Sequence, residues 1–409
     1  LDEFGNPVPG ATHTVALSLA SDPVGGTLSG TTEIVAQGGI ATFSDLSIDR
    51  PGEGYTLVAT AEGLASAVSS PFDVFLRFVS VNAGPLSTCA LALTGDAYCW
   101  GFGTFGNLGD GLGTSSTTPV LVSGGLEFIH LAGSCGLTVG GKAYCWGENR
   151  FGQIGDGTTT DRLSPVPVSG GLSFLYLSSG ELHRCGVSTT GEAFCWGDNF
   201  SGQLGDGTTT QGWAPGPVSG DLRFGWISGG GDHTCGVTED GGTFCWGGNH
   251  NGQLGDGTTV QSPIPKPVSG LPNLASVNAG FRRSCGIEQG GTASCWGLNY
   301  AGQFGDGTKI DRHFPVPVSG GLSFTSISGS GHFTCGLTAD VEAFCWGNNG
   351  FGQLGNGTTT DWLSPAPVSG DLIFRALSSG SKHTGGITTA GQAFCWGDNS
   401  DGHAHVADA

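Results

Sequence analysis

The sequence predicts an all-β fold, and three observations support that prediction. The tripeptide Cys-Trp-Gly occurs seven times, with its cysteines at positions 99, 145, 195, 245, 295, 345 and 395. Glycine supplies 78 of the 409 residues and charged residues only 12%, which favours tight turns over helices. Short apolar runs alternate with turn residues inside each period, which is 46 residues once and then 50, as in the blades of a propeller. From about residue 77 onward, we therefore expect a seven-bladed β-propeller.

One repeat, residues 172–219, shows the layout of a single blade. The four expected strands cover 174–177, 185–188, 192–196 and the neighbourhood of 217–218. A glycine-rich loop at 202–208 separates the third strand from the fourth. Four short strands in each unit indicate a blade, because a solenoid coil would have a shorter period.

The cysteines predict a covalent bond within each blade. A three-residue loop ending in Gly191 would place Cys185 directly opposite Cys195, within disulfide reach. Reduced core cysteines and metal ligands are the alternatives, but the sequence has no Cys-x-x-Cys pair and the spacing is a regular ten residues. The expected disulfides are Cys89–Cys99, Cys135–Cys145, Cys185–Cys195, Cys235–Cys245, Cys285–Cys295 and Cys335–Cys345.

Cys395 is the exception among the thirteen cysteines, because Gly385 stands where its partner is expected. It is either a buried thiol, which we favour, or a partner for another chain. Six disulfides predict an oxidising compartment, which means a secreted or cell-surface protein.

The units resemble the regulator of chromosome condensation (RCC1) repeat in its secreted bacterial form. Residues 196–208 and 246–258 carry the Trp-Gly-x-Asn-x-x-Gly-Gln-Leu-Gly-Asp-Gly-Thr motif, the second with Gly in place of Asp. Residues 183–186 and 233–236 carry His-x-Cys-Gly. The resemblance covers residues 77–402 and implies a seven-bladed propeller. Arg283 departs from the pattern by replacing the histidine of the fifth unit.

Residues 1–70 resemble a partial immunoglobulin-like β-sandwich of the type found in bacterial invasins and intimins. The turn Gly-Asn-Pro-Val-Pro-Gly-Ala at 5–11 carries that resemblance, and the strand that precedes it in those domains is missing. Sequence upstream of Leu1 or a strand from another molecule would complete the sheet. Residues 71–409 form the expected propeller domain, and the segment around 71–75 is expected to complete its last blade, because Pro71–Val74 precedes the repeat as 165–168 does in a later unit.

The search for chemistry predicts no catalytic residue, no cofactor and no enzyme. Asp156 and Asp161 alternate with small residues, but the loop lacks the carboxylate density of a calcium site, so a structural turn is the better interpretation. His403 and His405 are two candidate metal ligands near a terminus, too few to predict a site. The histidines 183, 233 and 383 share one repeat position, where we expect the same structural hydrogen bond inside each blade, and the repeated tryptophans are expected to pack between blades.

The variable positions are the candidate binding residues. The residue after the repeated asparagine changes character from unit to unit, and two tryptophans are expected at matching places in another loop. Together they form the expected binding rim: Arg150, Phe200, His250, Tyr300, Trp213 and Trp362. The alternative is that these side chains merely cap their loops. Asn199 and Asn356 begin glycosylation sequons.

Net charge and hydropathy argue against two classes of binding partner, nucleic acids and membranes. A net charge of −20 without any basic run argues against nucleic acid, and no stretch is long and apolar enough for direct membrane insertion. The chain starts at Leu1 and contains no Met, which suggests a processed or partial sequence.

We expect a non-enzymatic extracellular structural or adhesion module. Its partner would be a protein, including copies of itself joined by strand complementation into a filament or surface layer. The alternative is a secreted protein-binding propeller, such as the relatives that inhibit β-lactamases. Nucleotide exchange on a small GTPase fits the disulfides poorly.

Overall fold

The computed structural model describes residues 8–48, 50–271 and 273–402. It divides the chain into two compact units, with the boundary between Leu76 and Arg77. The described residues are folded almost entirely as strands and turns, with one short 3-10 turn, η1 (Thr104–Gly106). No helix in this part of the chain has the length and apolar character needed to cross a membrane.

The first unit is built around one long strand. Its strands are β1 (Thr14–Ser21), β2 (Leu28–Ser29), β3 (Glu33–Val35), β4 (Ser47–Ile48), β5 (Gly52–Ala61), β6 (Ala67–Val68) and β7 (Phe72–Val74). The main sheet has the order β3-β1-β5-β6, β7 also pairs with β5, and β2 and β4 form a separate pair. Tyr55 on β5 is fully buried and donates a hydrogen bond of 2.9 Å to the carbonyl of Arg50. The immunoglobulin-like assignment of this unit stays a prediction.

The expected closure of the last blade by residues 71–75 is wrong. Strand β7 pairs with β5 inside the first unit, with Val74 opposite Gly52 and Phe72 opposite Tyr55. The Phe72 ring stacks on Tyr55 at 6.3 Å, and Asp73 on the other face of the strand accepts a hydrogen bond from the Gly54 amide. The apolar side chain therefore completes a core in the first unit, and the expected domain boundary at residue 70 moves to residue 76.

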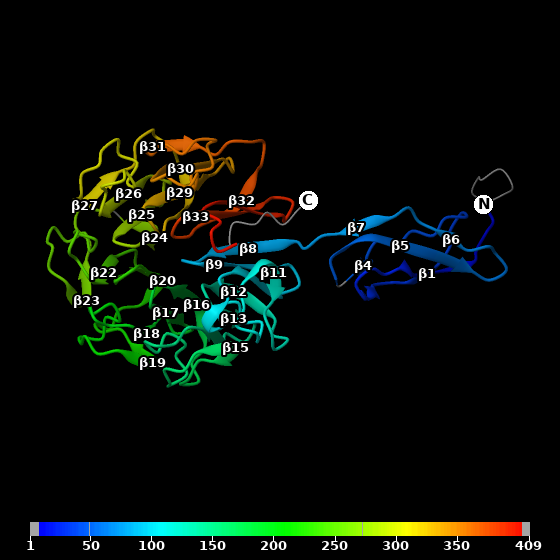
Figure 1. Cartoon of the computed structure of the whole chain (residues 1–409), viewed down its shortest axis with the longest axis horizontal. Helices are drawn as coiled ribbons and strands as arrows, with labels where there is room; N and C mark the ends of the chain where they lie inside the picture. Colours follow the sequence, from blue (N-terminus) through cyan, green and yellow to red (C-terminus); the bar gives the residue numbers. More distant parts are fainter. Residues whose placement is uncertain (1–7, 49, 272, 403–409) are drawn as a thin grey trace. The chain divides into compact units, whose positions relative to one another are not determined.

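The second unit consists of repeated antiparallel sheets that follow one another around a ring (Figure 1). Six of these sheets have four strands, and the last has three in the described residues. The first three sheets are β8 (Phe78–Ala83), β9 (Ser87–Ala92), β10 (Ala97–Gly101) and β11 (Ser116–Leu121); β12 (Phe128–Ala132), β13 (Cys135–Thr138), β14 (Ala143–Gly147) and β15 (Arg162–Pro167); and β16 (Phe174–Ser179), β17 (His183–Ser188), β18 (Ala193–Gly197) and β19 (Gly212–Pro217). The next two are β20 (Phe224–Gly229), β21 (His233–Thr238), β22 (Thr243–Gly247) and β23 (Ser262–Pro267), and β24 (Leu274–Ala279), β25 (Arg283–Glu288), β26 (Ala293–Gly297) and β27 (Arg312–Pro317). The last two are β28 (Phe324–Ser328), β29 (Phe333–Thr338), β30 (Ala343–Gly347) and β31 (Trp362–Pro367), and β32 (Phe374–Ser379), β33 (His383–Thr388) and β34 (Ala393–Gly397). We number these sheets blade 1 to blade 7 in chain order.

Six disulfides join the second and third strands of blades 1 to 6, at the predicted pairs. In blade 3, Cys185 lies directly opposite Cys195, with their Cα atoms 4.1 Å apart. Gly191 has φ +81° in the connecting turn, a conformation that favours glycine. At the matching place in blade 6, Val341 adopts φ 58°.

The ring closes between blade 7 and blade 1 through the contacts that join the other blades. The amide of Ala83 in β8 donates to Ser378 Oγ of β32 at 2.9 Å, as the Gly229 amide of blade 4 donates to Ser178 Oγ of blade 3. The Phe78 amide donates to the carbonyl of Gly391 at 2.7 Å. Strand β33 accordingly lies beside β8 in Figure 1. Among the residues that the structure describes, repeated side-by-side packing therefore closes the ring.

Tryptophans fill the spaces between blades, as predicted. Trp146 of blade 2 packs in the same core cluster as Cys89, Leu91 and Cys99 of blade 1. At the next interface, Trp196 of blade 3 packs closely against a loop of blade 2. A methyl group on Gly155 in that loop would lie 2.6 Å from the Trp196 indole nitrogen. Burial of these large rings supplies much of the apolar stabilisation of the unit.

Cys395 is a buried thiol opposite Gly385, which excludes it as an accessible partner for another chain. Burial raises its pKa to about 12, so the reactive thiolate is suppressed. A methyl group on Gly385 would lie 3.7 Å from Cys395 Sγ. Positions 385 and 395 of blade 7 therefore share the strand register of the other six pairs.

We predict that Gly385→Cys forms a seventh disulfide with Cys395. The free thiol measured in denaturant should fall from one per chain to none, and the free energy of unfolding should rise by about 2 kcal/mol. Gly385→Ala is the matched control, because its added carbon also approaches a Val81 methyl group at 2.9 Å but cannot form the bond. Two reactive thiols in the denatured variant would contradict the prediction.

Candidate functional site

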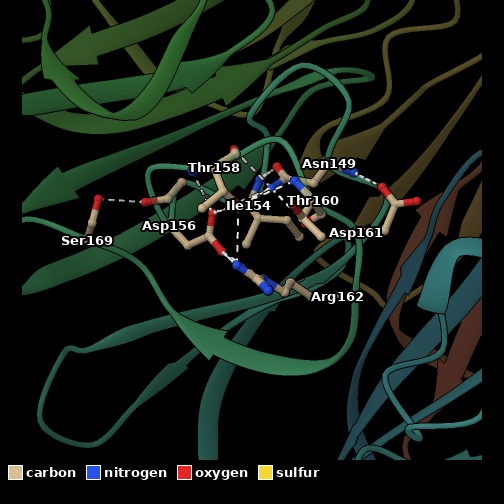
Figure 2. A network of polar contacts seen from close by, with 9 residues as sticks. Asn149, Ile154, Asp156, Thr158, Thr160, Asp161, Arg162 and Ser169 are labelled. Atoms are coloured by element: carbon tan, nitrogen blue, oxygen red, sulfur yellow. Dashed lines mark hydrogen bonds and ion pairs between the residues drawn. The ribbon is translucent and has the colours of Figure 1, made fainter.

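A buried asparagine fixes the loop between the third and fourth strands of a blade. In blade 2, Asn149 donates from Nδ2 to the carbonyls of Thr158 and Thr160, both at 3.0 Å. Its Oδ1 accepts the amide of Ile154 at 2.9 Å, as Figure 2 shows. Asn199, Asn249, Asn299 and Asn349 make the same contacts in blades 3 to 6. These asparagines are fully buried, so the loop is pinned from the inside.

The carboxylates of this loop accept hydrogen bonds within the turn. Asp156 accepts hydrogen bonds from the Thr158 amide at 3.0 Å and from Arg162 Nε at 2.7 Å (Figure 2). Burial alone would raise the pKa of Asp156, but the hydrogen bonds from Thr158 and Arg162 outweigh it and hold the pKa below its usual value. Asp161 accepts a hydrogen bond of 2.8 Å from the main-chain amide of Asn149. In the described ranges, no group of three or more His, Cys, Asp or Glu could hold a metal ion, and His403 and His405 lie outside those ranges.

The residue that follows the buried asparagine points outward. Phe200 is 68% exposed and Tyr300 is 53% exposed, although each is bonded to a fully buried neighbour. Arg150 and His250 are exposed at the same position of blades 2 and 4. The predicted rim positions 150, 200, 250 and 300 are therefore display positions on a fixed loop.

A second loop lies beside this one on the same side of each blade. It connects the first and second strands, and its last residue accepts a hydrogen bond from the start of the asparagine loop. The amides of Asp198, Leu298 and Asn348 donate in this way to the carbonyls of Leu182, Arg282 and His332, each at 2.9 Å. We call the side of the ring that carries both loops the loop face.

Aromatic and basic side chains meet on the loop face across neighbouring blades. The Tyr300 ring of blade 5 contacts the His332 ring of blade 6 at 5.0 Å, and His332 contacts Phe281 at 5.7 Å. Lys382 of blade 7 lies over the Phe351 ring of blade 6 at 4.8 Å. Sequence reasoning missed His332, Phe281, Phe351 and Lys382. For His332 and Lys382, the available signal was the variation at one repeat position, 232, 282, 332 and 382.

Charge is divided between two parts of the loop face. Glu181 and Asp232 lie on blades 3 and 4, and Glu148 of blade 2 pairs with the exposed Arg150 at 2.8 Å, whereas Arg282 and Lys382 lie on blades 5 and 7. Burial raises the pKa of Glu181, and Asp232 raises it further, while Arg282 opposes both effects. On the basic side, burial lowers the pKa of His332, and the nearby arginines lower it further. A partner would therefore meet an acidic sector beside an aromatic and basic one.

Comparison with known proteins assigns the repeat. The family model of the regulator of chromosome condensation (RCC1) repeat matches residues 94–140, 140–187, 190–237, 240–286, 291–337 and 342–387. The chain belongs to the RCC1-repeat family. A second model of this repeat matches residues 176–203, 324–353 and 374–402. No curated protein sequence matches the chain.

Solved structures with RCC1-like propellers share the fold. Human WBSCR16 matches with a TM-score of 0.69 and 21% identity over 78% of this chain and 89% of that one. Yeast RCC1 (Prp20), solved with Kap60 bound, matches with a TM-score of 0.66 and 18% identity over 84% and 86%. The ectodomain of the Physcomitrella patens receptor kinase CR4 matches with a TM-score of 0.51 and 24% identity over 79% and 74%. At these identities, the likeness concerns the fold alone.

Two predictions about the rim need correction. Trp213 and Trp362 lie in the outer strands β19 and β31 and not in a loop. They are also one position apart in the repeat, because Gly212 pairs with Gly197 whereas Trp362 itself pairs with Gly347. Trp213 packs on the preceding RCC1 repeat, where a methyl group on Gly152 would lie 2.6 Å from its ring. Both side chains remain about half exposed.

The side-chain nitrogens of both glycosylation candidates are buried in the folded chain. Asn199 is fully buried, and its Nδ2 donates to the carbonyl of Thr210 at 2.9 Å as part of the loop clamp. Asn356 is partly exposed, but the Nδ2 atom that would carry a glycan is buried. Its Oδ1 accepts the Thr358 amide at 3.1 Å, which turns the amide group inward. The folded chain therefore offers neither side chain to a glycosylating enzyme.

The repeated histidines connect neighbouring RCC1 repeats, and the expectation of a bond inside each blade is wrong. His183 Nε2 of blade 3 lies 2.8 Å from Thr234 Oγ1 of blade 4. That hydroxyl donates its own proton to the carbonyl of Gln203 at 2.8 Å. Because the hydroxyl has one proton, His183 Nε2 must be the donor. Burial lowers the pKa of His183 to about 3, so the ring is neutral at ordinary pH with its proton on Nε2. His233 and Ser284 repeat the arrangement at 2.9 Å between blades 4 and 5.

Arg283 adapts the same position in blade 5. Its Nη2 donates to the carbonyl of Phe333 and, at 2.7 Å, to Thr334 Oγ1 of blade 6. Burial lowers the pKa of Arg283 to about 9. Blade 6 has Phe333 at the position, fully buried. The repeat therefore tolerates a histidine, an arginine or a phenylalanine at one interblade position.

We predict that acid weakens the ring through these histidines. Burial lowers the pKa of His183 to about 3 and that of His233 to about 4, below the ordinary value of 6.5. At pH values between these lowered pKa values and 6.5, the unfolded chain binds protons that the folded chain does not. The free energy of unfolding therefore falls as the pH falls below 6.5. Acidification from pH 6.5 to 5 should lower the free energy of unfolding by about 1–2 kcal/mol for each histidine.

Urea unfolding at several pH values measures this effect. The matched control is the double variant His183→Phe, His233→Phe, which copies the natural Phe333 of blade 6 and removes both titrating groups. The variant should lose stability less steeply between pH 6.5 and 5 than the unchanged chain. Equal slopes for the two proteins would contradict the account.

Proposed function

We propose that this chain is a non-enzymatic module, a seven-bladed propeller that binds a protein through its loop face outside the cytoplasm. The observation that carries the proposal is the pairing of rigid support with exposed aromatic rings. Phe200 and Tyr300 are each more than half exposed, and each follows an asparagine that is fully buried. Large aromatic side chains that lose little freedom on binding are typical hot spots of protein interfaces.

The neighbouring loop supports the same proposal. Phe281, His332 and Tyr300 form a continuous set of ring contacts between blades 5 and 6. Arg282 lies over the Phe281 ring at 5.3 Å and adds charge to this aromatic cluster. A protein with an acidic and apolar patch would complement it, whereas the net charge of −20 disfavours nucleic acid.

The disulfides support an oxidising compartment. Six short-range bonds, each spanning ten residues, persist where thiols are not kept reduced. This setting favours the extracellular proposal over nucleotide exchange on an intracellular GTPase. Yeast RCC1, which shares the fold, was solved with a protein, Kap60, bound to it.

Site-specific photocrosslinking tests the loop face. A benzophenone amino acid in place of Tyr300 should capture a protein partner in the native source of the chain. The matched control carries the same group at Gln289, an exposed residue in the turn at the other end of blade 5. Because Gln289 lies away from the loop face, we expect no adduct there.

The outcome at Phe200 completes the test. An adduct of the same mass should form from a benzophenone at position 200, because blades 3 and 5 present that position on one face. Adducts of equal yield at 200, 289 and 300, or none at 200 and 300, would contradict the proposal.

Assembly through the first unit is a second candidate function. Strand β1 pairs with β3 only at Thr14–Ala16, while its pairing with β5 runs on to Ser21. In the residues that the structure describes, the outer edge of Ser18–Ser21 has no partner strand. An unpaired edge is a template for a strand from another chain, which would support a surface layer or filament.

Light scattering distinguishes assembly from monomeric binding. Strand complementation predicts a mass that rises with concentration above the 41.3 kDa of one chain. Substituting Leu19→Pro should suppress that rise, because proline removes a donor from the edge strand. A mass that stays at 41.3 kDa at all concentrations would reject assembly and leave the loop-face proposal untouched.

A further inference from the structure

The ring encloses a cavity of about 840 Å³ lined by the first strands of the blades. One repeat position, the third residue of the first strand, determines how its wall changes around the ring. In chain order the residues at this position are Ser80, His130, Tyr176, Trp226, Ser276, Ser326 and Ala376. Three successive blades therefore present rings and the other four present small side chains.

The three rings form a stack that follows the curve of the ring. His130 and Tyr176 have centroids 4.7 Å apart, and Tyr176 stacks on Trp226 at 4.6 Å with 29° between the planes. Each end of the stack also reaches a main-chain acceptor in the next blade. Trp226 Nε1 donates to the carbonyl of Val277 at 2.8 Å, and His130 Nε2 donates to that of Leu177 at 2.9 Å. Each of these two contacts combines a planar ring with an N–H group.

The stack stops at blade 5. Ser276 occupies the position that would place a fourth ring against Trp226, and Ser326 occupies the next. By the repeat, Ile327 and Leu377 of blades 6 and 7 correspond to the acceptor residues Val277 and Leu177, and both line the cavity. The wall therefore offers space beside Trp226. It also offers the carbonyl positions of Ile327 and Leu377, which no ring of the preceding blade reaches.

Asn278 adds an acceptor next to this space. Its Oδ1 is buried and has no hydrogen-bond partner in the described part of the chain. The serines at the same position of neighbouring blades, Ser178, Ser228 and Ser328, each accept an amide of the next blade at 2.8–3.0 Å. Asn278 also lines the cavity. A buried acceptor without a donor is unfavourable, and rotation of the half-buried Asn278 side chain toward the cavity would let a bound N–H group relieve it.

We propose that the central cavity binds a planar heteroaromatic molecule that carries an N–H donor. Its ring would continue the stack on Trp226 in the space beside Ser276 and Ser326. Its N–H group would donate to an acceptor of this wall, either Asn278 Oδ1 or a main-chain carbonyl. The cavity volume lies in the range of small-molecule sites, and its lining extends to Glu181, His332 and Lys382 of the loop face, which gives a route of entry.

The probe is 5-fluoroindole, observed by ¹⁹F NMR with the full chain. We expect saturable binding with a dissociation constant of about 1 mM or tighter for a ligand of this size. 5-Fluoro-1-methylindole keeps the ring but lacks the N–H group, and it should bind about tenfold more weakly. A fluorinated glucose tests the other ring-shaped class and should not bind. Absence of saturable indole binding, or preferred binding of the sugar, would overturn the proposal.

Ser276→Tyr locates the site without removing any existing contact. The new ring should stack on Trp226 as Tyr176 does and fill the proposed space, so 5-fluoroindole binding should fall at least tenfold. Gln289→Tyr adds the same ring to an exposed turn of blade 5 and should bind as the unchanged chain does. If Ser276→Tyr fails to fold, Ser326→Tyr fills the adjoining place one blade further. Unchanged binding in a folded variant would overturn the assignment.

Discussion

The ring depends on the hydrogen bonds that the main-chain carbonyl of a loop glutamine accepts from the next blade. Gln203 O of blade 3 accepts the Trp246 indole N–H at 3.0 Å and the Thr234 hydroxyl at 2.8 Å, both from blade 4. Gln253, Gln303 and Gln353 do the same at the next interfaces. Each acceptor is buried in its loop, so breaking one pair would leave polar groups unsatisfied between blades. The loops that display side chains are thus the loops that hold the blades together.

Within each of these loops, the residues that fix the backbone differ from the residue that is exposed to a partner. The buried asparagine, the glutamine carbonyl and the tryptophan fix the backbone of the loop, and none of them needs the side chain that follows the asparagine. That position can therefore change from Arg150 to Phe200 to Tyr300 without loss of the fold. Inside the ring, the same freedom lets three first strands carry a stack of rings while four carry small residues.

The cysteine ladder and the blade repeat could be predicted because strand register converts sequence spacing directly into neighbours. Contacts between blades could not, because the repeat does not reveal which neighbour a side chain reaches. The histidine at 183 therefore seemed to bond within its blade. The segment 71–75 was misassigned because an apolar strand of its pattern suits either unit, and the ring stack of Phe72 on Tyr55 decides between them. Asn199 has the sequon pattern, but its role as a loop clamp buries it.

Hydrogen exchange of the tryptophan indole protons, followed by NMR, tests the central claim most directly. The indole N–H groups of Trp196, Trp246, Trp296 and Trp346 each donate to a glutamine carbonyl of the preceding blade. If these bonds hold the ring together, all four protons should exchange only with global unfolding and should share one exchange free energy. Faster exchange of individual indole protons, blade by blade under native conditions, would contradict the account.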